Sequence, residues 1–254
     1  MSAASLAGRT VLVTGGSSGI GKAIALAAAR AGADVAITFR ANAQGAEEVQ
    51  RAIGALGRRT SAIHLDLASA ASLADLGASA RRALGCVDVW INNAGADILT
   101  GDGASLSRIE KLDRLIAVDL RGTMLASWQA AEMLGAQTGG GVIINMSWDH
   151  VITGMAGQNP ELYSAVKGGI LAFSKSLARS VAPRVRVNVI APGFIETGFG
   201  ARADERWRRE VVEATPLQRW GTPDDVAGAA VFLASPAAAF LTGQTILVGG
   251  GVVM

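Results

Sequence analysis

The sequence predicts one α/β domain: a Rossmann-type, doubly wound sheet of seven parallel strands with helices on both faces. Two observations predict this fold class. Seven short runs of β-branched or apolar residues alternate with longer alanine-rich stretches that have helical spacing. In addition, the first run leads directly into a glycine-rich turn that precedes the first helical stretch. Seven buried strands with helices between them indicate a parallel sheet.

The predicted strands are bounded by turn or loop residues. Three glycines at residues 139–141 and an Ala-Pro-Gly sequence at 191–193 are examples of such boundaries. In chain order, the strands are predicted at residues 10–14, 35–39, 61–65, 87–91, 142–146, 185–190 and 245–248.

Helices are predicted between the strands. One is expected over residues 22–31, after the glycine-rich turn. The sequence Thr222-Pro223-Asp224-Asp225 should start another, because proline is favoured in the first turn of a helix. Two longer helices are predicted near residues 108–137 and 161–181.

No stretch is long or polar enough to be an interdomain linker, so residues 1–254 are predicted to form one domain. Residues 194–221 break the alternation of strands and helices, and they carry Phe199, Trp207 and Trp220 among charged residues. This segment follows the carboxyl end of a strand, where ligands bind to such sheets. We therefore expect a lid over the ligand crevice at about 194–221.

The composition excludes several classes of protein. No run approaches the roughly 18 apolar residues of a membrane span, and residues 1–7 lack the pattern of a signal peptide. A cytoplasmic location is therefore expected. The net charge of +2 argues against a nucleic-acid-binding protein. One basic cluster is expected to be a solvated helix face, or else a contact to an anionic substrate carrier; it comprises Arg202, Arg206, Arg208 and Arg209.

The chain has a single cysteine, Cys86, which excludes an internal disulfide. It lacks the neighbouring Cys or His residues of a metal site, so no metal is expected. We expect Cys86 to be a small buried hydrophobic residue.

The glycine-rich turn reads Thr14-Gly15-Gly16-Ser17-Ser18-Gly19-Ile20-Gly21. Glycines allow the backbone to turn tightly and to approach a diphosphate, whose charge is met by the N-terminus of the following helix. The position of this turn, between a first strand and a first helix, predicts a dinucleotide-binding site.

Tyr163 is the only tyrosine of the chain, and Lys167, one of four lysines, follows four residues later. If this segment is helical, the two side chains share one face, so the ammonium lies beside the phenol. A nearby cation favours the phenolate, and we therefore expect the pKa of Tyr163 to move from about 10 toward neutral pH. Such a tyrosine can exchange a proton with a substrate oxygen.

With these motifs the chain resembles the short-chain dehydrogenases/reductases, in which TGxxxGxG, NNAG and YxxxK occur in this order. Here they are residues 14–21, 92–95 and 163–167. Residues 192–197 (PGFIET), 219–223 (RWGTP) and 241–244 (LTGQ) are similar to the β-ketoacyl-acyl-carrier-protein reductase-like branch. The resemblance spans nearly the whole chain and implies an NAD(P)-dependent enzyme.

The resemblance implies four catalytic positions: Tyr163 as the proton donor to a carbonyl, Lys167 as the residue that lowers its pKa, Ser147 as the donor that orients the carbonyl, and Asp119. It places Asn93, Ala94 and Gly95 at the adenosine ribose, Asp66 and Leu67 at the adenine, and Ile195 and Thr197 at the nicotinamide carboxamide. Asn92 is expected to tie two strand ends together. The full cofactor-binding set is Gly15, Ser17, Ser18, Gly19, Ile20, Gly21, Arg40, Asp66, Leu67, Asn93, Ala94, Gly95, Tyr163, Lys167, Pro192, Gly193, Ile195 and Thr197.

The end of the second predicted strand bears on the choice of cofactor. An NAD-selective enzyme places an acidic residue there to bond the ribose 2′-hydroxyl, whereas an arginine accommodates a 2′-phosphate. Phe39 occupies the position of the acid, and Arg40 follows it. We therefore predict NADP (NADPH) in preference to NAD.

Asp119 departs from the family pattern, which has an asparagine in a Val-Asn-Leu-x-Gly segment; here residues 118–122 read Val-Asp-Leu-Arg-Gly. In the family this residue distorts a helix, so that its main-chain carbonyl holds a water that leads to the lysine. Aspartate competes for backbone hydrogen bonds much as asparagine does, so the distortion and the proton relay should persist. A lost relay is the alternative.

A second departure lies before the tyrosine. The family serine precedes the tyrosine by about thirteen residues, whereas Ser147 precedes Tyr163 by sixteen. Counting back thirteen reaches His150, and alignment from the preceding strand places Trp148 at the serine position. Ser147 is the predicted carbonyl donor, and Asp149 and His150 are candidates for a substrate-specific role; a partly exposed loop histidine is the simpler interpretation of His150. Trp148, Met155 and Phe194 are expected to line an apolar pocket or the core.

Together these features predict an oxidoreductase that transfers hydride between a nicotinamide and a small carbonyl or alcohol substrate, with Tyr163 as general acid/base. One alternative is a reductase of a pteridine or other cyclic substrate, and another is a non-catalytic cofactor-binding protein on the same fold. The resemblance implies a homotetramer in which the long helices pair between subunits. Neither nucleic acid nor a membrane is an expected partner.

Overall fold

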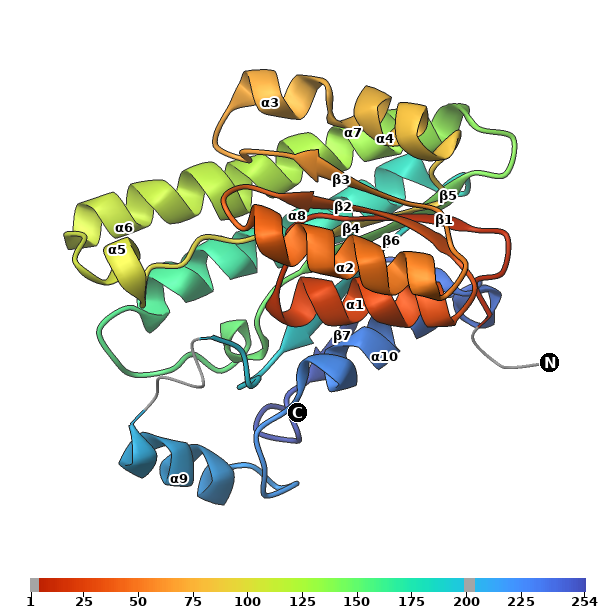
Figure 1. The fold of residues 1–254 in the computed structure, drawn as a ribbon. Helices are drawn as coiled ribbons and strands as arrows, with labels where there is room; N and C mark the ends of the chain where they lie inside the picture. The colour runs from red at the N-terminus through yellow and green to blue at the C-terminus, as the bar shows by residue number, and fades with distance from the viewer. Residues whose placement is uncertain (1–4, 199–203) are drawn as a thin grey trace.

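The computed structural model describes residues 5–198 and 204–254, and it confirms the predicted fold class. Seven parallel strands form one sheet in the order β3-β2-β1-β4-β5-β6-β7 (Figure 1). Phe199 and Arg202 lie outside the described residues. The strands are β1 (Thr10–Val13), β2 (Asp34–Phe39), β3 (Thr60–His64), β4 (Val89–Asn92), β5 (Gly141–Met146), β6 (Val185–Pro192) and β7 (Thr245–Val248).

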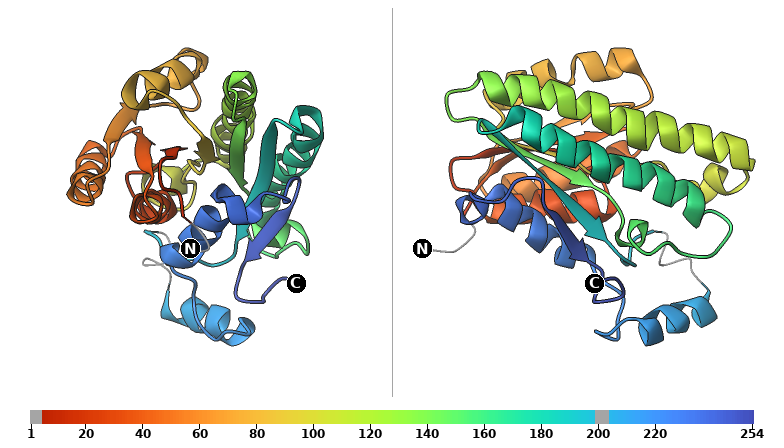
Figure 2. Two further views of the ribbon diagram at one scale, coloured as in Figure 1. Left: turned by 90° about the vertical axis from the view of Figure 1, so that its right-hand side faces the viewer. Right: turned by 180° about the vertical axis from the view of Figure 1, so that it is seen from behind.

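Helices cover both faces of the sheet (Figure 2). One face packs against α1 (Gly19–Arg30), α2 (Ala43–Ala55) and α10 (Pro223–Ala234), and the other against α4 (Leu76–Leu84), α7 (Gly122–Ala136) and α8 (Pro160–Val181). Two apolar cores result, one on each side of the sheet. The remaining helices are α3 (Ala70–Ala74), α5 (Gly101–Ala104), α6 (Arg108–Leu115) and α9 (Glu205–Ala214). No helix of the described residues is long and apolar enough to cross a membrane.

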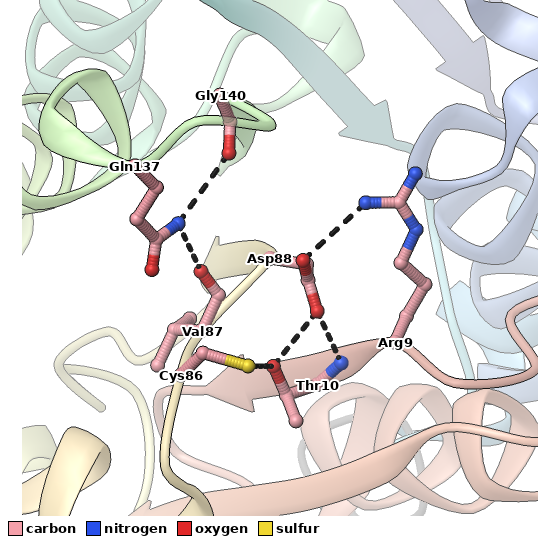
Figure 3. Close-up of polar contacts among 7 residues, drawn as sticks. All are labelled: Arg9, Thr10, Cys86, Val87, Asp88, Gln137 and Gly140. Carbon is pink, nitrogen blue, oxygen red and sulfur yellow. Dashed lines mark hydrogen bonds and ion pairs between the residues drawn. The ribbon is translucent and has the colours of Figure 1, made fainter.

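The bounds of six of the seven strands differ from the prediction by one or two residues, and the differences are largest at β4 and β6. β6 continues through Pro192, because its pairing with β7 extends to Pro192 and Val248. β4 begins at Val89 rather than at residue 87, where its register with β1 starts at Val11. Just before it, Asp88 joins the two strands through its side chain: Asp88 Oδ2 accepts hydrogen bonds from Thr10 N at 2.8 Å and from Thr10 Oγ1 at 2.9 Å (Figure 3).

The expectation that Cys86 is buried is wrong. It lies exposed in the loop between α4 and β4, with its Sγ 3.3 Å from Thr10 Oγ1 (Figure 3). The neighbouring Val87 is buried and packs in the core instead. Gln137 braces this loop by donating a hydrogen bond to the Val87 carbonyl at 2.9 Å.

The predicted helix over residues 108–137 is interrupted by a π-helical turn, Ile116–Arg121 (η1), between α6 and α7. By contrast, α10 begins where its sequence signal predicted. The Thr222 side chain accepts a hydrogen bond from Asp225 N, and the Asp225 carboxylate accepts one from Thr222 N, which is a capping box.

Residues 194–221 leave the sheet after β6 and return before α10, and their described part contains α9. A single pair of residues, Ile195 and Gly221, forms a parallel bridge at the base of this excursion. In Figure 1, α9 stands apart from the two helical layers, below the carboxyl end of β7. Arg206 and Arg208 of the predicted basic cluster form ion pairs with Glu210 and Glu196.

Candidate active site

The segments that carry the predicted site residues follow the carboxyl ends of β1 to β6, at one edge of the parallel sheet (Figure 1). β1 lies between β2 and β4, so the chain winds in opposite directions on its two sides. In doubly wound sheets a ligand crevice forms at such a reversal. The functional side chains are supplied by the turn after β1, the segments after β4, β5 and β6, the η1 turn and α8.

The glycine-rich turn forms a cradle in which Gly15, Gly16 and Gly21 leave no room for a side chain. Gly15 and Gly19 adopt φ angles of 67° and 53°, which favour glycine. A Cβ on Gly21 would lie 2.2 Å from the Gly15 carbonyl oxygen. The first turn of α1 has no acidic residue, and the side chain of its N-cap, Ser18, forms no capping hydrogen bond. Backbone N–H groups at this helix end are therefore available to a diphosphate, so the turn fits the predicted cofactor.

The segment after β4 braces this cradle. Thr14 Oγ1 accepts hydrogen bonds from Asn93 N at 2.9 Å and from Ala94 N at 3.0 Å, and the Asn93 side chain donates to the Thr14 carbonyl at 3.0 Å. The sequence placed Asn93 at the adenosine ribose; in the structure its amide group is bonded to the glycine-rich turn. Asn92 has the expected structural role, because its side chain donates to Asn145 of β5 at 2.8 Å.

Asp119, Lys167 and Tyr163 form a connected group beside this cradle. The Lys167 ammonium lies 2.8 Å from Asp119 Oδ2 and 5.3 Å from the centroid of the Tyr163 ring. Lys167 and Asp119 are buried, whereas Tyr163 is half-buried. The i,i+4 spacing on α8 thus places the ammonium beside the phenol, as the sequence predicted.

The η1 turn positions Asp119. The predicted helix distortion is present, since residues 116–121 form a π-helical turn. Asp119 Oδ1 accepts a hydrogen bond from Ala96 N at 2.7 Å, so the carboxylate joins the segment after β4 to α8. Gly95 leaves room for it: a Cβ there would lie 2.8 Å from Asp119 Oδ2.

The pKa values in this group differ from the sequence-based expectation. Burial raises the pKa of the Tyr163 phenol, the Lys167 ammonium lowers it, and the Asp119 carboxylate raises it further; the net result is a pKa above the usual value of 10.0. The expected shift of Tyr163 toward neutral pH is therefore wrong for the protein without its cofactor. Burial lowers the pKa of Lys167, but Asp119 and Tyr163 outweigh it and raise this pKa above its usual range.

Ser147 is used within the protein. Its hydroxyl donates a hydrogen bond to the Lys167 carbonyl oxygen at 2.8 Å, and the residue is buried. A hydroxyl has one proton, so in this arrangement Ser147 braces α8 and does not present a donor to a substrate carbonyl. The sequence-based role of Ser147 as carbonyl donor is not favoured by this geometry.

The segment after β5 contributes aromatic side chains next to Tyr163. Trp148 contacts the Tyr163 ring edge-on, with centroids 5.3 Å apart, and stacks on His150 at 4.9 Å. His150 is 7% exposed and contacts Phe194 at 5.3 Å, so its interpretation as a partly exposed loop residue is wrong. Phe194 in turn contacts Trp207 and Trp220, both from residues 194–221.

The other predicted cofactor residues are spread along the same edge. A Cβ on Gly19 would lie 3.6 Å from Thr197 Cγ2, so Thr197 faces the glycine-rich turn. Ile195 and Leu67 are buried, whereas Arg40 is exposed directly after β2. Asp66 Oδ1 accepts a hydrogen bond from Ala68 N at 2.9 Å. Pro192 ends β6, and the following Gly193 donates its backbone N–H to the Val248 carbonyl. Ser17 and Ile20 belong to the glycine-rich cradle.

Sequence reasoning missed Asn42. Its side chain donates a hydrogen bond to the Ser17 carbonyl of the glycine-rich turn at 3.2 Å and accepts one from Gly45 N at 3.0 Å. Asparagine before a helical stretch is a typical N-cap, so the capping contact was predictable from the sequence. The contact to Ser17 was not, because it joins α2 to the turn before α1.

Comparisons with known proteins agree with this geometry. A family model described as Enoyl-(Acyl carrier protein) reductase matches residues 15–253. The chain is 38% identical over 250 residues to L-rhamnose 1-dehydrogenase (NAD(P)(+)) of a Sphingomonas species, covering 97% of this chain and 96% of that protein. It is 36% identical over 249 residues to the 3-oxoacyl-[acyl-carrier-protein] reductase of Aquifex aeolicus, covering 97% and 98%.

Solved structures show the same similarity over the whole chain. A short-chain dehydrogenase of Burkholderia cenocepacia, solved in complex with NADP, superposes with a TM-score of 0.88 at 33% identity, covering 97% of this chain and 98% of that chain. A short-chain dehydrogenase/reductase of Serratia marcescens gives a TM-score of 0.88 at 32% identity, covering 98% and 99%. The chain belongs to the short-chain dehydrogenase/reductase family and is an oxidoreductase that uses a pyridine nucleotide.

Proposed function

We propose that this oxidoreductase transfers hydride between NADP(H) and a carbonyl or alcohol substrate, with Tyr163 as the general acid/base. The observation that carries the proposal is the contact of the Tyr163 phenol with a buried ammonium, Lys167, that is itself paired with Asp119. This group lies at the same sheet edge as the glycine-rich cradle. A proton donor and a hydride donor can therefore meet on one substrate.

A nicotinamide cofactor, when bound at the glycine-rich cradle, would supply the hydride that the carbonyl carbon accepts. Tyr163 gives its phenolic proton to the carbonyl oxygen, which leaves an alcohol, an oxidised cofactor and a tyrosinate. The Lys167 ammonium stabilises that tyrosinate, and Asp119 holds the ammonium charged and in place. The raised pKa of Tyr163 keeps the phenol protonated at neutral pH, which is the form that can donate a proton.

Replacement of Tyr163 tests this proposal directly. A panel of ketones, aldehydes and cyclic carbonyl compounds is assayed with NADPH and NADH. Tyr163→Phe should lower kcat/KM by about 10²- to 10⁴-fold, the usual contribution of a positioned acid, because phenylalanine keeps the ring but has no proton to give. Lys167→Met should also be severely impaired, and Lys175→Met, an exposed lysine on the same helix, provides the matched control.

Two results would argue against the proposal. Undiminished turnover in Tyr163→Phe would remove Tyr163 from the chemistry. Tight NADPH binding by the native protein with no turnover across the panel would favour a non-catalytic cofactor-binding protein. The second candidate function, reduction of a cyclic substrate, is favoured by the aromatic wall of Trp148, His150 and Phe194. Turnover confined to the open-chain compounds would count against it.

The preference for NADP is supported by Arg40, which is exposed at the carboxyl end of β2 with Phe39 in place of a carboxylate. A guanidinium attracts the 2′-phosphate that distinguishes NADP from NAD. We expect NADPH to bind at least about tenfold more tightly than NADH, a difference of roughly 1.4 kcal/mol. Titration of both cofactors gives the two dissociation constants, and tighter binding of NADH would reverse the assignment.

Residues 194–221 are proposed as a substrate lid. Phe194 and Trp207 connect the described part of this segment to the aromatic wall beside Tyr163. Closure on a ligand would bury these rings and exclude water. Slower backbone hydrogen exchange in α9 when cofactor and substrate are both present would support a lid, and unchanged exchange would not.

A further inference from the structure

Asp149 and His150 form a polar pair that the proposed hydride transfer does not use. Both belong to the short 3-10 turn Asp149–Val151 that follows β5. Asp149 Oδ1 lies 2.6 Å from His150 Nδ1 and accepts a hydrogen bond from His150 N at 2.7 Å. Asp149 is completely buried, and His150 is nearly so. A buried polar pair of this kind is costly to maintain unless it is well satisfied.

Two glycines from other strands make room for the Asp149 carboxylate. A Cβ on Gly193 would lie 2.6 Å from Asp149 Oδ2, and a Cβ on Gly249 would lie 2.1 Å from it. Gly193 follows β6 and Gly249 follows β7, so three adjacent strands end around this one side chain. No other residue in the described part of the chain hydrogen-bonds to Oδ2. Among the described residues, the Asp149 carboxylate is therefore hydrogen-bonded by His150, through Oδ1.

This contact determines which nitrogen of the neutral His150 ring carries the proton. A carboxylate accepts hydrogen bonds, so the proton of the neutral imidazole is on Nδ1 and the lone pair is on Nε2. Within residues 5–198 and 204–254, nothing hydrogen-bonds to Nε2, and this atom is not fully buried. A carboxylate that orients a histidine in this way leaves the second nitrogen free to act on a ligand.

The His150 ring lies in the wall beside the proposed proton donor. Trp148 contacts both rings: it stacks on His150 with an interplanar angle of 25° and meets Tyr163 edge-on. Phe194 closes the other side of His150. Trp148 therefore contacts both the imidazole of His150 and the phenol ring of Tyr163.

We infer that His150, oriented by Asp149, is a second recognition group of the substrate site, whose Nε2 accepts a hydrogen bond from a substrate hydroxyl on a carbon other than the one that exchanges hydride. The substrate class is therefore a ketone or alcohol that carries at least one further hydroxyl group and packs an apolar face on Trp148. This inference rests on the proposed function, because it assumes that Tyr163 addresses the reacting oxygen.

Ketone pairs that differ by one hydroxyl group test this inference. Cyclohexanone is compared with its 2-, 3- and 4-hydroxy derivatives, and kcat/KM is measured with NADPH for each. We expect the native protein to favour at least one hydroxylated partner by tenfold or more, because the hydroxyl satisfies a nearly buried acceptor. His150→Phe, which keeps a ring of similar shape but has no acceptor, should bring this ratio close to one, and His150→Gln should restore part of it.

Controls separate recognition from folding. Ile152→Ala, at the end of the same turn and more than half exposed, should keep the native ratio. Gly249→Ala should lower the ratio, since its Cβ would displace Asp149. The same pairs are titrated into the NADP-loaded native protein and His150→Phe by calorimetry, so that recognition is measured even without turnover.

Each of these measurements either supports the role of His150 or overturns it. The inference is overturned if the native protein neither turns over nor binds any hydroxylated ketone better than cyclohexanone. It is also overturned if His150→Phe keeps the native preference, or if this variant loses activity equally toward both ketones of each pair. The proposed function fails separately, if Tyr163→Phe turns over either member as fast as the native protein.

Discussion

The residues beside the substrate site form two buried acid–base pairs with different environments. Asp119 pairs with Lys167, and their contact to Tyr163 tunes a proton donor. Asp149 pairs with His150, and their contact presents an imidazole nitrogen. In both pairs the carboxylate contacts no substrate in our proposal; it orients a neighbouring group that does. Each carboxylate lies against glycines, Gly95 for Asp119 and Gly193 and Gly249 for Asp149, at positions where a Cβ would clash with it. Asp119 also accepts a backbone hydrogen bond from Ala96 N.

Replacement of Asp119 should move the pH dependence of the reaction. The Asp119 carboxylate raises the pKa of Tyr163, so Asp119→Asn, which removes its charge, should lower that pKa. Alcohol oxidation requires the phenolate as base, and its kcat/KM rises with pH as the phenol loses its proton. The rise should therefore occur at lower pH in the variant than in the native protein.

Asp113→Asn, an exposed carboxylate on α6, is the control, and its pH profile should match the native one. An unchanged profile in Asp119→Asn, or a rise displaced to higher pH, would contradict the role given to Asp119. A large gain in rate for Asp119→Asn would instead show that the predicted proton relay is impaired by the carboxylate.

At the scale of elements, glycines decide how closely the segments of the site approach. Gly21 lies in the first turn of α1 against the Gly15 carbonyl, whereas Gly54 lies in α2, where a Cβ would have no neighbour within 4 Å. Both are helical glycines, and a helix by itself would be stabilised by alanine at either position. The two positions differ only in the atoms that a Cβ would meet outside the helix.

Alanine substitutions at these two positions should therefore have opposite effects. Gly21→Ala should lower the free energy of unfolding by about 1–3 kcal/mol and weaken NADPH binding, because the Cβ displaces the cradle. Gly54→Ala should raise it by about 0.5–1 kcal/mol and leave binding as it is. Urea unfolding and cofactor titration give both quantities. A fully stable Gly21→Ala with native affinity would contradict the tight cradle.

Element boundaries were largely predictable, because local patterns determine them. Seven apolar runs predicted seven strands, and the Thr222 capping signal predicted the start of α10. The exceptions have physical causes in contacts between elements. β4 starts at Val89, where its register with β1 begins, and β6 extends because β7 continues to pair with it as far as Pro192.

At the scale of the whole molecule, the outer face of α7 and α8 carries apolar side chains that a monomer would leave in water. Trp128 is half-exposed and contacts Phe173 of α8 with centroids 6.0 Å apart. Ile116 of the η1 turn and Phe240, beyond α10, are also exposed. Exposed apolar groups of this size are typical of surfaces that associate. Trp128 and Phe173 fit the homotetramer that the family resemblance implies, in which the long helices pair between subunits.

Light scattering should therefore give the mass of four chains. Trp128→Glu should reduce this mass to that of a dimer or monomer, because a carboxylate is costly to bury at an apolar contact. Leu56→Glu, an exposed leucine at the end of α2, should leave the mass unchanged. A monomer mass for the native protein would refute the proposal.

The sequence by itself determined the fold class, the approximate positions of the strands along the chain, the glycine-rich turn and the Tyr163–Lys167 spacing. Each of these is a local pattern that neighbouring residues impose through turn geometry, helix periodicity or continuous burial. The family resemblance added Asp119 as a position of interest and the distortion of its helix, which the η1 turn bears out.

Only the tertiary structure decided what these residues contact. The ion pair of Asp119 with Lys167, the use of the Ser147 hydroxyl by α8, the rise in the Tyr163 pKa and the burial of His150 all depend on segments distant in the sequence. The physical reason is that the burial of these side chains and their hydrogen-bond partners depend on which segments meet at the carboxyl edge of the sheet. The Asp149 carboxylate has its place because β5, β6 and β7 end together and two of the residues that follow them are glycines.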